Sequence, residues 1–172
     1  MDADSTPVQR LGSNWGRDIG FGLLAIAAVA IALVLGQIAT FPNLTPWYAG
    51  LHKPDFNPPN WLFGPVWTAL YVLMAFAVWR ILRIRYGGQT QRSALFLFFI
   101  QLVLNAAWSW LFFAAHNPWL GMMDILPQFF VLISTVVAFA MLDRTAAWCM
   151  VPVTLWVGFA GLLNLEIWRL NG

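Results

Sequence analysis

The chain has 172 residues, of which 60% are hydrophobic and only 9% are charged. A soluble domain carries about 25% charged residues, so this composition excludes a water-solvated globule and indicates that lipid covers much of the surface. The net charge is only +2, and the nine Lys and Arg residues lie mostly beside apolar runs, which argues against a nucleic-acid-binding protein.

Residues 1–18 are polar and irregular, and we expect them to form an N-terminal extension. The apolar run after them is too long for a signal peptide, so residues 19–40 are predicted to be a retained first spanning helix. Ala28, Ala32 and Gly36 recur in it every four residues, a stripe of small side chains that permits close helix packing. The stripe predicts a contact either inside the bundle or between two copies of the chain.

Residues 41–60 contain five prolines, which exclude a spanning helix there and predict a long loop of the kind that often forms a lid. The remaining sequence predicts four further helices. We therefore expect an all-α membrane protein, a five-transmembrane-helix bundle, with residues 19–171 as one membrane domain. An odd number of helices without an inverted repeat argues against the usual transporter plan. The second helix is expected to begin at residue 61 or 65 and to end at residue 83. The other three are expected over residues 94–115, 121–142 and 146–170.

The basic residues predict the orientation in the membrane, because Lys and Arg concentrate in cytoplasmic loops. Seven of them fall on one side of the predicted bundle and two on the other. We expect a cytoplasmic N-terminus and an outward-facing loop 41–60; the sequence does not say which membrane holds the protein. The larger group is Arg10, Arg17, Arg80, Arg83, Arg85, Arg92 and Arg144, and the smaller is Lys53 and Arg169.

The eleven tryptophans divide into two groups by their depth in the predicted helices. Seven lie near segment ends, as expected for an aromatic belt at the membrane interface. The four deeper ones need a hydrogen-bond partner for the indole N–H or a place in the protein core. The belt group is Trp15, Trp47, Trp61, Trp79, Trp119, Trp148 and Trp168, and the deeper group is Trp67, Trp108, Trp110 and Trp156.

Aromatic and amide side chains share one face on each of three predicted helices. Polar amides inside a membrane helix are costly unless they face protein or a cavity. If the three faces converge, they form an aromatic pocket with a few amides, suited to a flat apolar ligand; the alternative is a packed core with interhelical amide bonds. The faces are Trp67, Tyr71 and Met74; Gln101, Asn105, Trp108 and Phe112; and Trp156, Ala160 and Asn164.

Ionisable residues predict little conventional chemistry. Asp124 is expected to cap the fourth helix, and Glu166 to pair with Arg169 three residues later. The two histidines, His52 and His116, fall in outward loops with nothing to fix them on a haem iron. The single cysteine, Cys149, excludes an intrachain disulfide and a multi-cysteine metal site. No metal site and no acid–base catalytic group are predicted.

Three separated motifs then carry a resemblance to a known family. The stretch WYAGLHKPDFNPPNWLFGPVWTALY, residues 47–71, resembles the TspO/translocator protein family, also called the peripheral-type benzodiazepine receptor or TspO/MBR family. QLVLNAAWSWLFF, residues 101–113, resembles its third helix, and VPVTLWVGFAGLLNLEIWRLN, residues 151–171, resembles its fifth. The match covers about residues 19–171.

The resemblance implies a homodimeric five-helix receptor in the lipid bilayer that binds tetrapyrroles, such as protoporphyrin or haem, and benzodiazepine-like molecules. No cofactor is implied beyond porphyrin as ligand. Some bacterial relatives degrade protoporphyrin in light, and the two tryptophans associated with that chemistry match Trp67 and Trp156, so the sequence leaves enzymatic activity open. The family pattern carries over to Trp67, Asn105, Trp108, Trp156 and Ala160 in the pocket, and to Trp47, Lys53, Trp61 and Phe63 near the lid. Together with Tyr71, Gln101 and Asn164 from the shared faces, these are the predicted ligand-binding residues.

The chain also departs from the family pattern. Phe56 stands where relatives often have Trp, and Val153 stands where they often have Tyr. Leu165 replaces the aromatic residue after Asn164, so the animal-type cholesterol motif is not met. Two other classes of function remain open: a transporter or channel for small hydrophobic solutes, and a structural subunit of a larger membrane complex.

Overall fold

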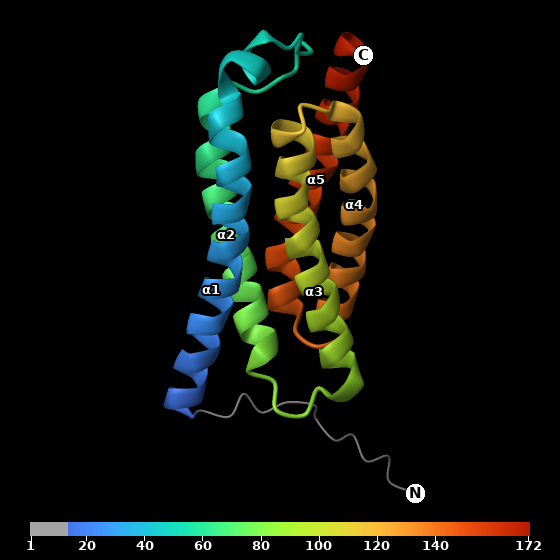
Figure 1. Cartoon of the computed structure of the whole chain (residues 1–172). Helices are drawn as coiled ribbons and strands as arrows, with labels where there is room; N and C mark the ends of the chain where they lie inside the picture. The colour runs from blue at the N-terminus through green and yellow to red at the C-terminus, as the bar shows by residue number, and fades with distance from the viewer. Residues whose placement is uncertain (1–13) are drawn as a thin grey trace, which may run out of the picture.

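The computed structural model describes residues 14–172 as a bundle of five long helices (Figure 1). All five are long and apolar enough to cross a membrane, and the described residues contain no strand. The predicted all-α membrane bundle is therefore confirmed. The helices are α1 (Trp15–Thr40), α2 (Asn60–Leu82), α3 (Gly88–Ser109, continued by a π-helical turn, Trp110–Ala114), α4 (Pro118–Ala140) and α5 (Arg144–Asn171).

The five helices close into a ring whose order differs from the chain order. α1 packs against both α2 and α3, α2 packs against α5, and α4 packs between α5 and α3. Short connections make α3, α4 and α5 antiparallel neighbours. Direct packing between α2 and α3 is slight. These two helices are joined through α1 on one side of the ring and through α5 and α4 on the other, and they do not pack closely across its interior.

The stripe of small residues on α1 faces the inside of the bundle. Ala32 is 5% exposed, and Gly36 is also buried. A Cβ atom added at Gly36 would lie 3.3 Å from Ser109 Oγ on α3, so glycine permits a close approach of the two helices. Of the two interpretations of the stripe, the contact inside the bundle is the one this structure contains.

The helices begin earlier than predicted, and α1 and α3 show this clearly. α3 begins at Gly88, where the Gln91 side chain donates to the carbonyls of Ile81 (2.7 Å) and Ile84 (3.1 Å) at the end of α2. α1 begins at Trp15 instead of residue 19. The structure describes nothing before residue 14, so Arg10 and most of the predicted extension, residues 1–18, lie outside the described residues.

The proline-rich segment forms a lid-like loop at the end of the bundle where α5 also ends (Figure 1). It starts with a short 3-10 helix, Phe41–Asn43, and a π-helical turn, Leu44–Tyr48, and then runs irregularly to α2. Asn171 fixes it to α5: its Oδ1 accepts from the His52 N–H (2.9 Å), and its Nδ2 donates to the His52 carbonyl (2.8 Å). Residues 119 positions apart are thus held together at the mouth of the bundle.

Candidate functional site

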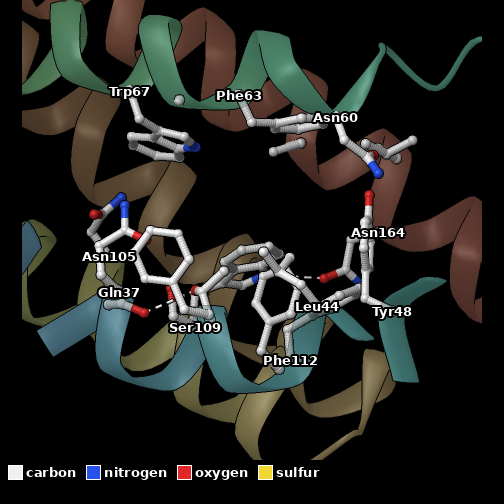
Figure 2. A pocket seen from close by; sticks show the side chains of 18 of the residues that line it. Gln37, Leu44, Tyr48, Asn60, Phe63, Trp67, Asn105, Ser109, Phe112 and Asn164 are labelled. Carbon is white, nitrogen blue, oxygen red and sulfur yellow. Dashed lines mark hydrogen bonds between the residues drawn. The ribbon is translucent and has the colours of Figure 1, made fainter. Parts of the chain in front are cut away.

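A cavity of about 580 Å³ lies inside the loop end of the bundle. All five helices and both π-helical turns contribute to its wall. Figure 2 shows Trp67 and Phe63 of α2 facing Ser109 and Phe112 across the space. The volume is typical of a small-molecule site.

The three aromatic faces predicted from the sequence converge on this cavity. They are joined by residues at the start of α2, where the loop enters the helix. Nine of the twelve predicted ligand-binding residues line the wall. These are Trp61, Phe63, Trp67, Tyr71, Asn105, Trp108, Trp156, Ala160 and Asn164.

The other three predicted residues lie outside the wall. Trp47 stacks on the His116 ring, with centroids 4.7 Å apart, and so fixes the loop to the end of α3. Lys53 Nζ donates to the carbonyls of Tyr48 (2.6 Å) and Leu51 (3.2 Å), and partial burial lowers the pKa of Lys53 below its usual value.

Gln101 is completely buried one helical turn below Asn105, and its Nε2 contacts Met74 Sδ at 3.6 Å. Gln101 and Asn105 do share one face of α3, but the cavity ends before it reaches Gln101. Met74, which is fully buried, fills this level of the bundle.

The amides in the wall also connect the helices. Tyr71 of α2 donates its hydroxyl to Asn105 Oδ1 of α3 at 2.5 Å. Trp108 Nε1 donates to Asn164 Oδ1 at 3.0 Å, and Asn164 Nδ2 donates to the Pro118 carbonyl at 2.7 Å. The pocket and the packed core with interhelical amide bonds are therefore two descriptions of the same residues, because these bonds hold the wall in place.

Sequence reasoning missed the contribution of α1 and α4 to the wall. Gln37, Thr40 and Gly36 line the cavity from α1, and Gln128 lines it from α4. Gln37 is the only amide within an otherwise apolar predicted span, which is the signal that was available. Gln128 follows Pro127 in an apolar run and offered the same signal.

The ionisable residues near the helix ends behave in two ways. Asp124 does not cap α4, which was the prediction: it lies in the second turn, and Asn117 caps the helix by accepting from the Leu120 N–H at 3.1 Å. Asp124 is instead 7% exposed, on the interior side of α4. The predicted Glu166–Arg169 pair is confirmed, with Arg169 Nη1 2.7 Å from Glu166 Oε1.

The cavity wall contains no ionisable side chain other than tyrosine among residues 14–172. His52 is held through its backbone, and His116 Nε2 lies 2.7 Å from Asn43 Oδ1 outside the wall. The arrangement offers aromatic surface and neutral hydrogen-bonding groups. It suits binding of a flat, largely apolar molecule.

Comparison with known proteins identifies relatives across most of the chain. The model of the TspO/MBR family matches residues 24–169. The tryptophan-rich protein TspO of Chlorobaculum tepidum is 39% identical over 83% of this chain and 92% of its own length. The human translocator protein is 38% identical over 73% of this chain and 75% of its own. The tryptophan-rich sensory protein of Cereibacter sphaeroides is 35% identical over 73% of this chain and 77% of its own.

Proposed function

The chain belongs to the TspO/MBR family, and from this premise we propose that it is a membrane receptor for flat hydrophobic ligands, with tetrapyrroles such as protoporphyrin IX as the principal class. The observation that carries the proposal is the cavity of about 580 Å³ with Trp67 and Trp156 in one wall and no charged side chain there. Benzodiazepine-like molecules have the same flat, apolar character.

The macrocycle would lie against the indoles of Trp67 and Trp156, whose π faces offer a large, rigid contact area. Tyr71 tilts against Trp67 with centroids 5.6 Å apart, and Phe63 packs edge-on to Trp156 at 5.9 Å. These neighbours hold the two indoles in position before a ligand enters, which reduces the entropy lost on binding.

The propionate groups of a porphyrin would stay at the loop end of the cavity, because an ionised carboxylate is costly inside the bilayer. Asn60 lines the wall there as the first residue of α2. Asn60 is better placed to meet the propionates than Lys53, whose ammonium group is bonded to loop carbonyls.

Titration of the reconstituted protein with protoporphyrin IX tests the proposal. We expect saturable binding with a Kd of about 1 µM, equivalent to about −8 kcal/mol. Trp67→Ala or Trp156→Ala should each weaken it by about fivefold or more, since lost aromatic contact is worth about 1 kcal/mol. Trp148→Ala is the matched control, because Trp148 is on α5 but is 72% exposed outside the bundle.

Absorbance of the porphyrin should be the readout, since the variants themselves change protein fluorescence. Linear, non-saturating behaviour in the wild type would refute the proposal. Saturable flux of a hydrophobic solute into liposomes, above that of empty vesicles, would favour a transporter instead.

A light-dependent activity is a second candidate, favoured by the presence of both Trp67 and Trp156 in the wall of one cavity. An indole beside an excited porphyrin can donate an electron to it, which needs no metal or acid–base pair. Under illumination, the Soret band of bound protoporphyrin should decay with the wild type and persist with Trp67→Phe plus Trp156→Phe. Equal decay with both proteins would mean that these tryptophans take no part.

A further inference from the structure

Gln128 is a buried amide whose hydrogen bonds the protein does not complete. It lies on α4, is only 2% exposed and lines the cavity. Its Nε2 has no hydrogen-bond partner among the described residues. It comes ten residues after the helix begins at Pro118, so it lies about 15 Å along α4 from the loop end, within the bilayer.

Trp156 carries a second buried donor without a hydrogen-bond partner. It lines the same cavity from α5, the helix that packs against α4, and its Nε1 also has no partner among residues 14–172. The other wall groups differ, because Tyr71, Trp108 and Asn164 donate to protein acceptors. Buried donors without a partner are rare and destabilising in native proteins.

The surroundings of Gln128 define which acceptor could complete these bonds. No Lys, Arg or His lines the cavity among the described residues, so nothing there would balance an ionised carboxylate. Asp124 precedes Gln128 by one turn on the same helix and is itself buried, with Oδ2 unpartnered. A neutral acceptor fits this environment, and an anion does not.

We propose that Gln128 and Trp156 form a deep subsite that binds a neutral carbonyl oxygen of the ligand, such as that of a ketone, amide or ester. Rotation about the last torsion of Gln128 exchanges its Nε2 and Oε1, so the amide turns its donor toward the ligand without moving the helix. The subsite rests on the proposed function, because it assumes that the cavity holds a ligand. A ligand that carries both groups would bind with its neutral carbonyl deep in the membrane and its carboxylates at the loop, whereas protoporphyrin IX, which has no neutral carbonyl, would leave the subsite unfilled.

A pair of probes that differ in one carbonyl tests the subsite. 9-Fluorenone and fluorene have the same flat ring system, and only the first carries a neutral acceptor. With the full chain in nanodiscs, and empty nanodiscs subtracted, we expect fluorenone to bind about tenfold more tightly than fluorene, as one buried hydrogen bond allows. The carbonyl stretch of bound fluorenone should shift to lower frequency.

The variants separate a direct contact from a structural effect. Gln128→Leu should reduce the fluorenone preference to about one by weakening fluorenone binding, and should abolish the shift of the carbonyl stretch. Trp156→Phe keeps an aromatic ring without the donor, and should reduce the preference in part. Thr135→Val is the matched control, because Thr135 is fully buried on the same face of α4 two turns further along and bonds only to Val131.

Each other outcome overturns the subsite. An unchanged fluorenone preference in Gln128→Leu, an equal loss for both probes, or no preference in the wild type because water occupies the site would each do so. If protoporphyrin still binds saturably in that case, the proposed function stands alone. If neither protoporphyrin nor the probes bind saturably, both proposals fail.

Discussion

At the residue scale, Asp143 makes interactions with two helices at once. It lies in the turn between α4 and α5, where its Oδ1 accepts from the Ala146 N–H at 3.0 Å and so caps α5. Its Oδ2 lies 2.7 Å from Arg80 Nη2 on α2. Burial alone would raise the pKa of Asp143, but the bonds from Arg80 and Ala146 and the charge of Arg80 outweigh it and hold the pKa below its usual value.

Two substitutions of Asp143 should distinguish the contribution of the ion pair to stability from that of the helix cap. Asp143→Asn keeps a good capping side chain and loses the charge, so we expect a loss of about 1–2 kcal/mol of stability. Asp143→Ala loses the cap as well, and should cost about 1 kcal/mol more. Thermal unfolding in detergent measures both effects; equal stability of all three proteins would contradict the two roles.

The same carboxylate predicts a pH dependence. Because the folded-state pKa is lowered, its contribution to stability is complete above the unfolded-state pKa of about 3.9 and is lost as the pH falls through the folded-state pKa. The Tm of the wild type should therefore decrease below about pH 4, and that of Asp143→Asn should decrease less. A difference between the two proteins that stays constant from pH 7 to pH 3 would contradict this assignment.

The tryptophans show how far position along a helix predicts environment. Trp15, Trp61 and Trp148 are 82%, 72% and 72% exposed, as expected for an interface belt. Trp110 is 46% exposed on the outer surface despite its predicted depth. Trp79, counted in the belt, donates its indole N–H to the Asp18 carbonyl at 3.0 Å and joins α2 to α1.

At the element scale, the start of α4 depends on a glycine that lets two helices approach it. A Cβ atom added at Gly121 would lie 2.7 Å from Asn164 Oδ1 on α5 and 3.1 Å from Phe112 Cβ. Asn164 cannot move freely, because it is bonded to both Trp108 and Pro118. α3, α4 and α5 therefore pack together at Gly121, beside the cavity.

Gly121→Ala should break the Asn164 bonds or separate the helices. We expect a loss of about 1–3 kcal/mol of stability from overpacking, together with weaker protoporphyrin binding as the Trp108 indole is released. Gly20→Ala is the matched control on α1, where no atom lies within 4 Å of the added Cβ; it should be neutral or slightly stabilising. Equal Tm values for the two variants would show that Asn164 is not fixed.

At the scale of the whole molecule, the basic residues within the described range 14–172 lie toward the two ends of the bundle, as predicted. Arg80 of α2 and Arg83, which directly follows this helix, pair with Asp143 and Asp18 at the end away from the loop. The cytoplasmic location of that end stays a prediction from the charge bias. Ion pairs between helices there also join α1 and α5 to α2, which closes the ring below the cavity.

Cysteine labelling tests the orientation. In a Cys149→Ser background, Asp55→Cys in the loop should react with a membrane-impermeant maleimide added to intact cells or right-side-out vesicles. Tyr86→Cys, at a position that is 89% exposed between α2 and α3, should react only after permeabilisation. The opposite pattern would place the loop in the cytoplasm.

The homodimer also stays a prediction at this scale. Ala32 and Gly36 are used inside the bundle, so a dimer would need a different surface from the stripe on α1. The outward faces carry large apolar side chains, as expected for contact with lipid.

The sequence by itself determined the five spanning helices, because runs of about 20 apolar residues have few alternatives in a bilayer. It also determined which faces of three helices carry aromatic and amide groups, because helical spacing is regular. Seven of the nine predicted residues in the wall follow from that spacing, whereas Trp61 and Phe63 were implied by the family resemblance. The Glu166–Arg169 pair was also predicted from helical spacing.

Only the tertiary structure decided the order of the helices in the ring and where the cavity ends. Gln101 and Asn105 are equivalent in spacing, yet Met74 fills the space beside the first and leaves the second in the wall. The roles of Gln37 and Gln128 likewise follow from which helices are neighbours. These are contacts between residues far apart in the sequence, and the pattern within a single helix contains no information about its partner.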